Sequence, residues 1–181
     1  MGVLLGRRID PFPRLLSPRN EKRPMDRDGK RPAMNKHDKK GRKHGPWEVR
    51  QNGSLYSRAH FKHGRLHGPA IFFHRNGLAD EKGTFHYGKK EGVWEKFHSN
   101  GSLYVRASYK NDLLCGAYES FNTKGKTLCR AWYNNGVKHG LQEEFDLEGE
   151  LLSKGVFENG APKGTWYAKN PVWYLASIGN N

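Results

Sequence analysis

The sequence has few cysteines, no long apolar run and no excess of acidic residues. Its two cysteines, Cys115 and Cys129, are too few for a disulfide scaffold and lack the spacing of a zinc site. We therefore expect two reduced thiols in a cytoplasmic protein, with a disulfide across neighbouring strands as the alternative. No apolar segment is long enough to cross a bilayer as a helix, so we expect no transmembrane segment.

The chain is also too polar for a thick globular core, because 35% of its residues are hydrophobic and 28% are charged. Its net charge of +14 is uneven: residues 1–44 hold 14 Lys and Arg against 5 Asp and Glu, together with five prolines. We expect residues 1–44 to form a basic, Pro-rich, disordered tail. Such a tail can attract nucleic acid or anionic lipid, although a solvated arm is the simpler interpretation.

What the sequence does contain is a repeat with a period of 24 residues. Its turn glycines are Gly53, Gly77, Gly101, Gly125 and Gly149. A base, a small residue and an aromatic residue follow each glycine at five, six and eight positions, as in Arg106, Ala107 and Tyr109. A second series ends the loops between units, at Gly45, Gly68, Gly92, Gly116, Gly140 and Gly164. Columns that stay in step through five units predict a repeat array over residues 45–169.

Each unit is typical of a β-hairpin. Its runs are short and rich in aromatic residues, and Leu103, Val105, Ala107 and Tyr109 alternate with more polar positions. Five hairpins and a last strand near Thr165 to Lys169 give about eleven strands. We therefore predict an all-β fold, an elongated single-layer antiparallel meander. The apolar stretch Pro171 to Ile178 is expected to cap its end, within residues 170–181.

The turn type can be predicted from the residues before each glycine. Asn-Gly suits a two-residue turn with positive φ at both positions, but Lys124 and Glu148 would fit that position badly. A three-residue loop with only the glycine left-handed fits all five units. This loop places Phe97 opposite Leu103 and Trp94 opposite Arg106, whereas a two-residue loop would place Glu95 opposite Arg106.

The glycine and aromatic spacing resembles MORN repeats. The best examples are Tyr133-Asn-Asn-Gly136-Val-Lys-His-Gly140 and Phe157-Glu-Asn-Gly160-Ala-Pro-Lys-Gly164. The form with about 24 residues is similar to the MORN-variant proteins of bacteria and large viruses, many described as YwqK-like antitoxin components. The resemblance covers about residues 41–169 and implies a non-catalytic hairpin array used for protein contacts or membrane association. Departures are Asp112 in place of a glycine, and Ala70 and Gln142 in place of an aromatic residue.

A basic column is the first candidate binding feature. It consists of Arg58, Lys82, Arg106, Arg130 and Lys154. Equivalent residues two strands apart lie about 9.5 Å apart, so the column would extend over roughly 40 Å. Such a line could bind an acidic partner, anionic lipid headgroups or nucleic acid. The simpler interpretation is pairing within the sheet with Glu95, Glu119 and Glu143 on preceding strands.

Aromatic residues form the second candidate feature, because protein interfaces are enriched in aromatic residues and arginine. Most of the periodic ones are expected to pack the sheet itself. Tyr104 and Trp132 are the better candidates for an interface.

Catalytic and metal-binding patterns are the third feature that we considered. His60, His63 and His67 have spacings that would favour a metal only on a helix, and here a strand end and a loop separate them. The sequence shows no nucleophile with its base, no pair of buried carboxylates and no phosphate loop. We therefore expect no enzyme, no cofactor and no metal site. The expected function is protein binding on one face of the sheet, for which the resemblance implies an antitoxin-like role, with binding of anionic lipid or another polyanion as the alternative.

Overall fold

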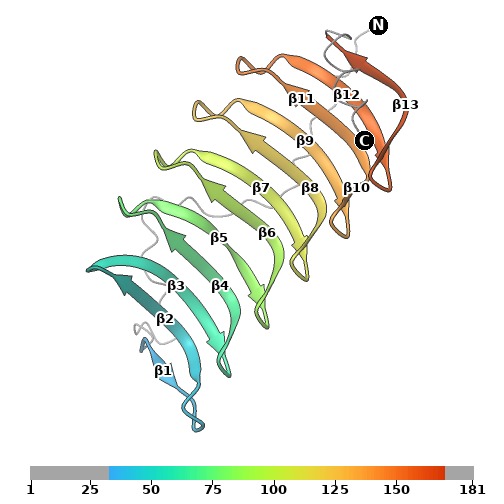
Figure 1. Ribbon diagram of the computed structural model, residues 1–181. Helices are drawn as coiled ribbons and strands as arrows, with labels where there is room; N and C mark the ends of the chain where they lie inside the picture. The colour runs from blue at the N-terminus through green and yellow to red at the C-terminus, as the bar shows by residue number, and fades with distance from the viewer. Residues whose placement is uncertain (1–32, 170–181) are drawn as a thin grey trace, which may run out of the picture.

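The computed structural model describes residues 33–169, which form one open, twisted sheet of thirteen strands (Figure 1). Strands follow one another across the sheet in chain order, and the short strand β10 pairs with β9 beside the main path. The described residues contain no helix, and so none that is long and apolar enough to cross a membrane. The predicted all-β antiparallel meander is confirmed.

The strand bounds define five hairpin units, formed by β2–β3, β4–β5, β6–β7, β8–β9 and β11–β12. The strands are β1 (Lys36–His37), β2 (Lys43–Gln51), β3 (Ser54–Lys62), β4 (Arg65–Phe73), β5 (Ala79–His86), β6 (Lys89–Phe97), β7 (Leu103–Lys110), β8 (Leu113–Phe121), β9 (Thr127–Asn134), β10 (Val137–Lys138), β11 (Gly140–Phe145), β12 (Leu151–Glu158) and β13 (Ala161–Ala168). Eleven of them have six to nine residues, as predicted, and β1 and β10 have two residues each.

The ends of the sheet differ from the prediction in two places. The last strand begins at Ala161, before the predicted start near Thr165. At the other end, residues 33–44 supply β1 and the first residues of β2, although the sequence placed them in the tail. The rest of the predicted tail and the predicted cap at residues 170–181 lie outside the described residues. The two cysteines, Cys115 and Cys129, are both free thiols.

The turn glycines explain why every unit closes into a hairpin. All five have φ values between 79° and 86°, a region that side chains with a Cβ atom rarely adopt. In the third unit, Gly101 N donates to His98 O at 2.8 Å and closes a three-residue loop. The predicted three-residue loop is correct for the second to fifth units.

The first unit departs from this pattern. Asn52 and Gly53 both have positive φ, 49° and 79°, and form a two-residue turn. The reason is that the first unit is one residue shorter before its turn. Gly53 lies eight positions after Gly45, whereas the turn glycines of the other units lie nine positions after the equivalent glycine. The three-residue prediction is therefore wrong for the first unit.

A β-bulge lies in the second strand of every unit, three residues after the turn glycine. The extra residues are Tyr56, Asp80, Tyr104, Leu128 and Leu152. Because a bulge sets two residues of one strand against one residue of its partner, every pair beyond it moves by one position.

This bulge corrects the predicted register. Phe97 pairs with Leu103, as predicted for a three-residue loop. Beyond the bulge Glu95 pairs with Arg106, so the predicted pairing of Trp94 with Arg106 is wrong. The alternation of side chains shows the two faces of a strand but not an inserted residue, and the sequence therefore gave no signal for this shift.

One face of the sheet carries a row in which large and small side chains alternate, except that Ala70 stands at one of the large positions. We call it the aromatic row, and it consists of Trp47, Ala59, Ala70, Gly83, Trp94, Ala107, Tyr118, Ala131, Gln142, Gly155 and Trp166. The small residues leave room for the neighbouring rings: a Cβ atom on Gly83 would lie 2.3 Å from the Trp94 ring. Trp94 is only 2% exposed, and its Nε1 donates to Thr84 O at 3.1 Å. This row is the nearest equivalent of a core in a sheet of one layer.

Candidate interaction surface

The opposite face carries a row that crosses ten strands and consists of charged residues except for Ile71 on β4. We call it the charge row, and it consists of Glu48, Arg58, Ile71, Lys82, Glu95, Arg106, Glu119, Arg130, Glu143 and Lys154. All five bases of the predicted basic column lie in it, on alternate strands. The bulge register brings them level with the glutamates of the intervening strands.

Each of these bases forms an ion pair with a glutamate of the row. The pairs are Arg58–Glu48 at 2.8 Å, Lys82–Glu95 at 3.3 Å, Arg106–Glu95 at 2.9 Å, Arg130–Glu119 at 3.2 Å, Arg130–Glu143 at 3.6 Å and Lys154–Glu143 at 3.0 Å. The structure thus agrees with pairing within the sheet. The predicted line of like charge is a row of alternating sign.

Burial of the charge row varies along the sheet. At its centre the side chains of Lys82 and Glu95 are 9% and 5% exposed, whereas Lys154 at its end is 46% exposed. Removing one member of a buried ion pair typically costs about 3–5 kcal/mol, because a charge is left without its partner. An exposed pair contributes about 1 kcal/mol or less. Loss of either partner at the centre of the row therefore destabilises the sheet, whereas the end of the row is exposed and accessible to a partner.

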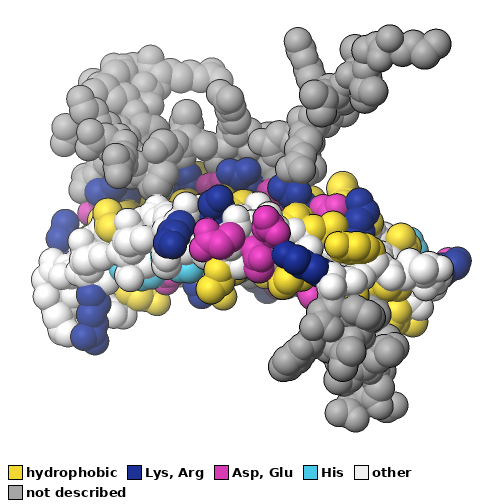
Figure 2. Space-filling view, turned by 90° about the horizontal axis from the view of Figure 1, so that it is seen from above, with side chains coloured by type: hydrophobic (Ala, Val, Ile, Leu, Met, Phe, Trp, Pro, Cys, Tyr) yellow, Lys and Arg dark blue, Asp and Glu magenta, His cyan; other side chains and the backbone are white. Residues whose placement is uncertain are grey.

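Phenylalanine rings flank the charge row on the same face. Lys82 Nζ lies 5.6 Å from the centroid of the Phe97 ring, and the Arg130 guanidinium lies 5.3 Å from that of Phe145. Such contacts contribute about 0.5–1 kcal/mol each. On the side seen in Figure 2, basic and acidic side chains lie next to one another, with hydrophobic side chains beside them.

The structure separates the two aromatic residues predicted to lie at an interface. Trp132 lies on the charged face, two residues from Arg130 on a regular stretch of β9. Tyr104 is a bulge residue that contacts the His98 ring, with centroids 4.7 Å apart. Burial raises the pKa of the Tyr118 phenol in the aromatic row, and Cys129, Tyr133 and Tyr104 add to that shift. Tyr104 and Trp132 therefore do not form one surface.

An exposed apolar patch surrounds Trp132 on the charged face. We call Trp132, Leu141 and Val156 the apolar patch; they are 48%, 38% and 43% exposed. Leu141 pairs directly with Val156. Trp132 lies beside the residue that precedes Leu141, because a Cβ atom built on Gly140 would lie 3.3 Å from the Cβ atom of Trp132. Of these three residues, only Trp132 was predicted from the sequence to lie at an interface. Leu141 lies eight residues before the turn glycine Gly149 and Val156 lies seven after it, and in the sequence both are ordinary strand residues.

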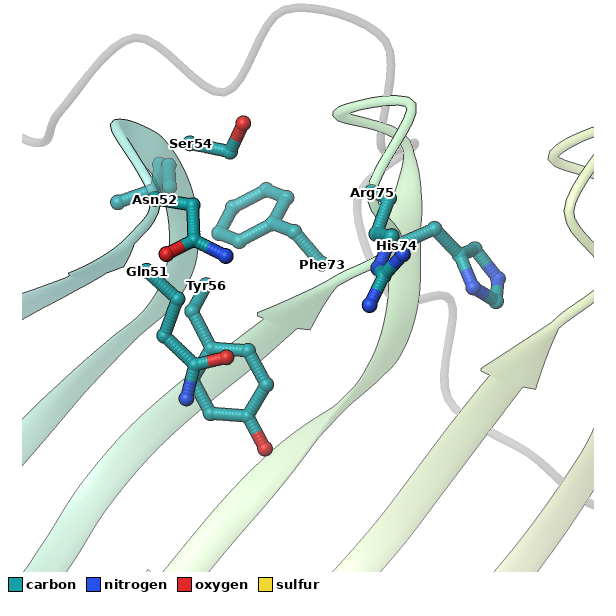
Figure 3. A pocket seen from close by; sticks show the side chains of 8 residues that line it. Gln51, Asn52, Ser54, Tyr56, Phe73, His74 and Arg75 are labelled. Carbon is teal, nitrogen blue, oxygen red and sulfur yellow. The ribbon is translucent and has the colours of Figure 1, made fainter.

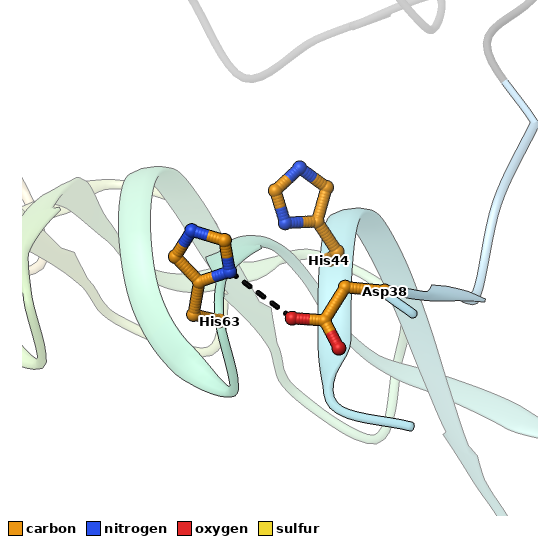
Figure 4. A group of neighbouring side chains, drawn as sticks. All are labelled: Asp38, His44 and His63. Carbon is orange, nitrogen blue, oxygen red and sulfur yellow. Dashed lines mark hydrogen bonds and ion pairs between the residues drawn. The ribbon is translucent and has the colours of Figure 1, made fainter. Parts of the chain in front are cut away.

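A histidine cluster connects the β1–β2 loop, which contains Asp38, to the β3–β4 loop, which contains His63. His63 Nδ1 lies 3.0 Å from Asp38 Oδ2, and His44 lies beside them with its ligand atom within 4.8 Å (Figure 4). Two imidazoles and a carboxylate are a set that a transition metal could use. However, the Arg42 guanidinium lies 2.7 Å from Asp38 Oδ2 and 3.1 Å from His63 Nδ1. A cation of the protein itself thus already bridges two of the three groups.

The pKa of Asp38 agrees with the interpretation that Arg42, rather than a metal ion, bridges Asp38 and His63. Hydrogen bonds from Arg42 and from His63 hold the pKa of Asp38 well below its usual range, with bonds from backbone N–H groups adding to the effect. The predicted spacing of His60, His63 and His67 played no part, because the partners of His63 come from the preceding hairpin β1–β2. Sequence reasoning missed the cluster because Asp38 and His44 fell inside the predicted tail.

The aromatic row is interrupted in the fifth unit by a polar cluster. Gln142 is 4% exposed, and its Nε2 donates to Glu144 Oε1 at 2.7 Å. Ser153 Oγ donates to the other oxygen of Glu144 at 3.2 Å. Gln142 Oε1 is buried and accepts no hydrogen bond within residues 33–169. The cluster replaces a ring with polar groups, and it marks the fifth unit as different from the third.

Comparison with solved structures finds only a weak likeness. The chain is 16% identical to a chain titled "Crystal Structure of TarM", and 15% identical to a mutant of TarM from S. aureus in complex with Fondaparinux, alpha-GlcNAc-glycerol and UDP. Each match covers 74% of this chain and 24% of the other, with a TM-score of 0.37. The chain thus spans about a quarter of those chains, and a TM-score this low carries no argument about its function. No curated protein matches the sequence.

Comparison with protein families gives a more specific result. The model of the MORN repeat variant matches residues 90–111 and 138–159. These segments begin at the first strand of the third unit and just before that of the fifth, and each extends through the turn glycine into the second strand. The predicted resemblance to MORN repeats is therefore confirmed at two places in the hairpin array.

Proposed function

We propose that this chain is a non-enzymatic, cytoplasmic module of the MORN-repeat type that binds a protein partner on the charged face of its sheet. The apolar patch is the observation that carries this proposal. A large aromatic side chain that remains exposed beside arginine is the combination that protein interfaces use as a hot spot. Trp132 and its neighbours Leu141 and Val156 supply the apolar part, and Arg130 and Lys154 supply the charged rim.

The ion pairs of the charge row favour a protein partner over a polyanion. A polyanion binds through unpaired cations, and its affinity falls steeply with salt. Here the five bases already share the four glutamates of the row. A protein surface can match alternating charges, whereas a phosphate backbone or a lipid surface presents one sign only.

A photo-crosslinking experiment tests the proposal. A photoreactive phenylalanine analogue replaces Leu141 in the apolar patch, and in a matched control it replaces Tyr104 on the other side of the sheet. The expected result is a crosslinked protein partner from the position of Leu141 only. The purified partner should then bind the Trp132→Ala variant about 30-fold more weakly, which corresponds to a hot spot of about 2 kcal/mol. Equal crosslinking from both positions would contradict the assignment of the face.

The partner could be a toxin, since the variant proteins that the sequence resembles are described as antitoxin components. Co-expression with a toxin-like reading frame next to this gene tests this finer proposal. Rescue of growth by the native chain, with loss of rescue for Trp132→Ala, supports neutralisation through the apolar patch. Unchanged toxicity in the presence of the native chain would remove it.

Binding of anionic lipid or another polyanion is the second candidate. It is motivated by the concentration of positive charge in residues 1–44. Sedimentation with vesicles that contain phosphatidylserine should then weaken steeply between 50 and 200 mM salt, about the range in which polyanion contacts lose most of their affinity. Deletion of residues 1–32 should abolish the binding. Salt-insensitive binding, or none, would remove this candidate.

A further inference from the structure

Side-chain bridges tie neighbouring turns together along one edge of the sheet. The bridges are Asn76 Nδ2 to Ser99 O at 2.7 Å, Asn100 Nδ2 to Thr123 O at 3.4 Å and Asn122 Nδ2 to Leu147 O at 2.9 Å. They connect the second turn to the third, the third to the fourth and the fourth to the fifth. Within the described residues no such bridge connects the first turn to the second. The equivalent donor and acceptor would be Asn52 Nδ2 and Arg75 O.

The missing bridge follows from the length of the first unit. Its turn has two residues where the others have three, so Asn52 stands in a left-handed conformation and does not reach the next turn. The result is a hollow of about 240 Å³, which we call the notch, lined among others by Asn52, Ser54, Phe73 and Arg75. A volume below that of an ordinary ligand pocket suits one side chain rather than a whole small molecule.

The arrangement of the lining groups gives the notch its chemistry (Figure 3). Asn52 and Arg75 lie on opposite sides of it, with the Phe73 ring between them. His74 points away from the notch and interacts with Phe97 O at 3.1 Å. The notch therefore has hydrogen-bond donors on two sides and an apolar wall.

The charges around the notch are mainly positive. Arg50 Nη1 donates to Gly53 O at 3.1 Å, and Arg58 lies over the Phe73 ring while paired with Glu48. Arg75 is exposed and forms no ion pair within residues 33–169. Oδ1 of Asp80, the acidic residue on the next strand, lies 3.6 Å from His74 Nε2, and Asp80 does not line the notch. The lining includes Arg75 and no acidic residue, so a negatively charged group that enters the notch meets a cation.

We propose that the notch binds the carboxylate of an acidic side chain on a partner protein. The guanidinium of Arg75 offers paired N–H donors that match the two oxygens of a carboxylate. The Asn52 amide and the Ser54 hydroxyl add neutral donors, and the Phe73 ring packs against the methylene group of the incoming side chain. This inference rests on the proposed function as a protein-binding module, and it assigns to the partner an acidic residue at the end of the sheet opposite the apolar patch.

The test is a titration of the full, ¹⁵N-labelled chain with sodium acetate, followed by NMR. The reference is sodium chloride at the same ionic strength. The expected result is a set of saturable shifts confined to Asn52, Ser54 and Arg75, with a midpoint on the order of 10 mM, as for a charged group held by a few hydrogen bonds. Shifts spread equally over the turns of all five units would overturn the proposal.

Two variants sharpen the titration. Arg75→Gln should weaken acetate binding at least fivefold, and the matched control Lys124→Gln, which removes a charge from the fourth turn, should leave it unchanged. Insertion of one serine between Gln51 and Asn52 restores the common length, so it should close the notch and abolish the shifts. Binding that survives both the substitution and the insertion would overturn the assignment.

Two further comparisons identify the ligand and separate the two proposals. Methyl phosphate should bind no more tightly than acetate, and clearly tighter binding would overturn the choice of a carboxylate. Trp132→Ala should leave the acetate titration unchanged. If the notch fails to bind acetate while Trp132→Ala still weakens the partner, only this inference falls. If Trp132→Ala leaves partner binding unchanged while acetate binds in the notch, only the assignment of the partner to the charged face is contradicted.

Discussion

The third and fifth units have the same backbone but different interiors. Both match the same family model, and both close on a left-handed glycine followed by a bulge. In the third unit Trp94 fills the space above Gly83 and lies edge-on to Phe85, with ring centroids 4.7 Å apart. In the fifth unit the equivalent residue is Gln142, which is equally buried but bonded to a carboxylate.

This difference shows that the hairpin and its contents are specified separately. Turn glycines and strand pairing build each unit whatever side chain fills the aromatic row. The ring decides how much apolar surface the unit buries. We therefore expect the two units to contribute unequally to stability, and the following substitutions test that expectation.

The largest expected effect comes from removing the ring. Trp94→Ala should lower the free energy of unfolding by about 3–5 kcal/mol, because a fully buried aromatic side chain leaves a cavity. Gln142→Ala should cost less than about 1 kcal/mol, because the Glu144 carboxylate that loses its bond is exposed and can bond water instead, and because a buried unsatisfied acceptor is removed as well. Urea denaturation followed by circular dichroism measures both. Equal losses would show that the two interiors are equivalent.

The second effect concerns the charge row in the same two units. Glu95→Gln leaves the buried Lys82 and its neighbour Arg106 without their shared carboxylate, and should cost about 3 kcal/mol. Glu143→Gln should cost about 1 kcal/mol or less, since Lys154 is half exposed and Arg130 keeps Glu119. The same denaturation experiment compares them. A larger loss at Glu143 would contradict the gradient of burial along the row.

A gain in stability is expected from Gln142→Leu. The substitution removes the buried Oε1 atom, which accepts no hydrogen bond within the described residues, and adds apolar contact with the aromatic row. Removing such an acceptor should stabilise the chain by about 1 kcal/mol. Thermal unfolding of the variant, compared with Leu141→Ala as an exposed control, checks the prediction. A lower melting temperature for Gln142→Leu would show that the polar cluster is stabilising.

The smallest effect is a pH dependence at the fifth turn. Hydrogen bonds from the backbone N–H groups of Glu150 and Glu148 lower the pKa of Asp146 below its ordinary value of 3.8. The carboxylate therefore contributes stability above pH 3.8, and this contribution is lost as the pH falls through the lowered pKa. Asn122 accepts the same two bonds in the fourth turn and cannot titrate. Asp146→Asn should therefore keep the turn and flatten the acid limb of the stability curve, whereas an unchanged curve would exclude Asp146 as its cause.

The sequence predicted the features that depend on local backbone chemistry. A left-handed turn requires glycine, and alternation shows which residues share a face, so the five hairpins and most of the meander could be derived. The bulges could not, because the apolar residues Leu103, Val105 and Ala107 keep a spacing of two through the inserted Tyr104, although the pairing places Leu103 and Val105 on opposite faces. The β1–β2 hairpin was missed for a different reason. It is held by contacts to the next unit, such as His63 with Asp38, that leave no trace in local composition.

The candidate surface was predictable only in part. The basic column follows from the period, but its pairing with glutamates depends on the register that the bulge sets. Trp132 was found because it is a large aromatic residue outside the periodic aromatic column; the equivalent residues in the other units are His60, Thr84, Ser108 and Val156. Leu141 and Val156 are ordinary strand residues, and only the cross-strand pairing brings them together.

The central claim, that a protein partner binds the charged face through the apolar patch, is tested most directly by one affinity comparison. Isothermal titration calorimetry with the crosslinked partner, once purified, should compare the native chain with Trp132→Ala and Tyr104→Ala. We predict that Trp132→Ala raises the dissociation constant about 30-fold and that Tyr104→Ala leaves it within about twofold. A loss of affinity for Tyr104→Ala alone would contradict the claim and place the partner on the aromatic face.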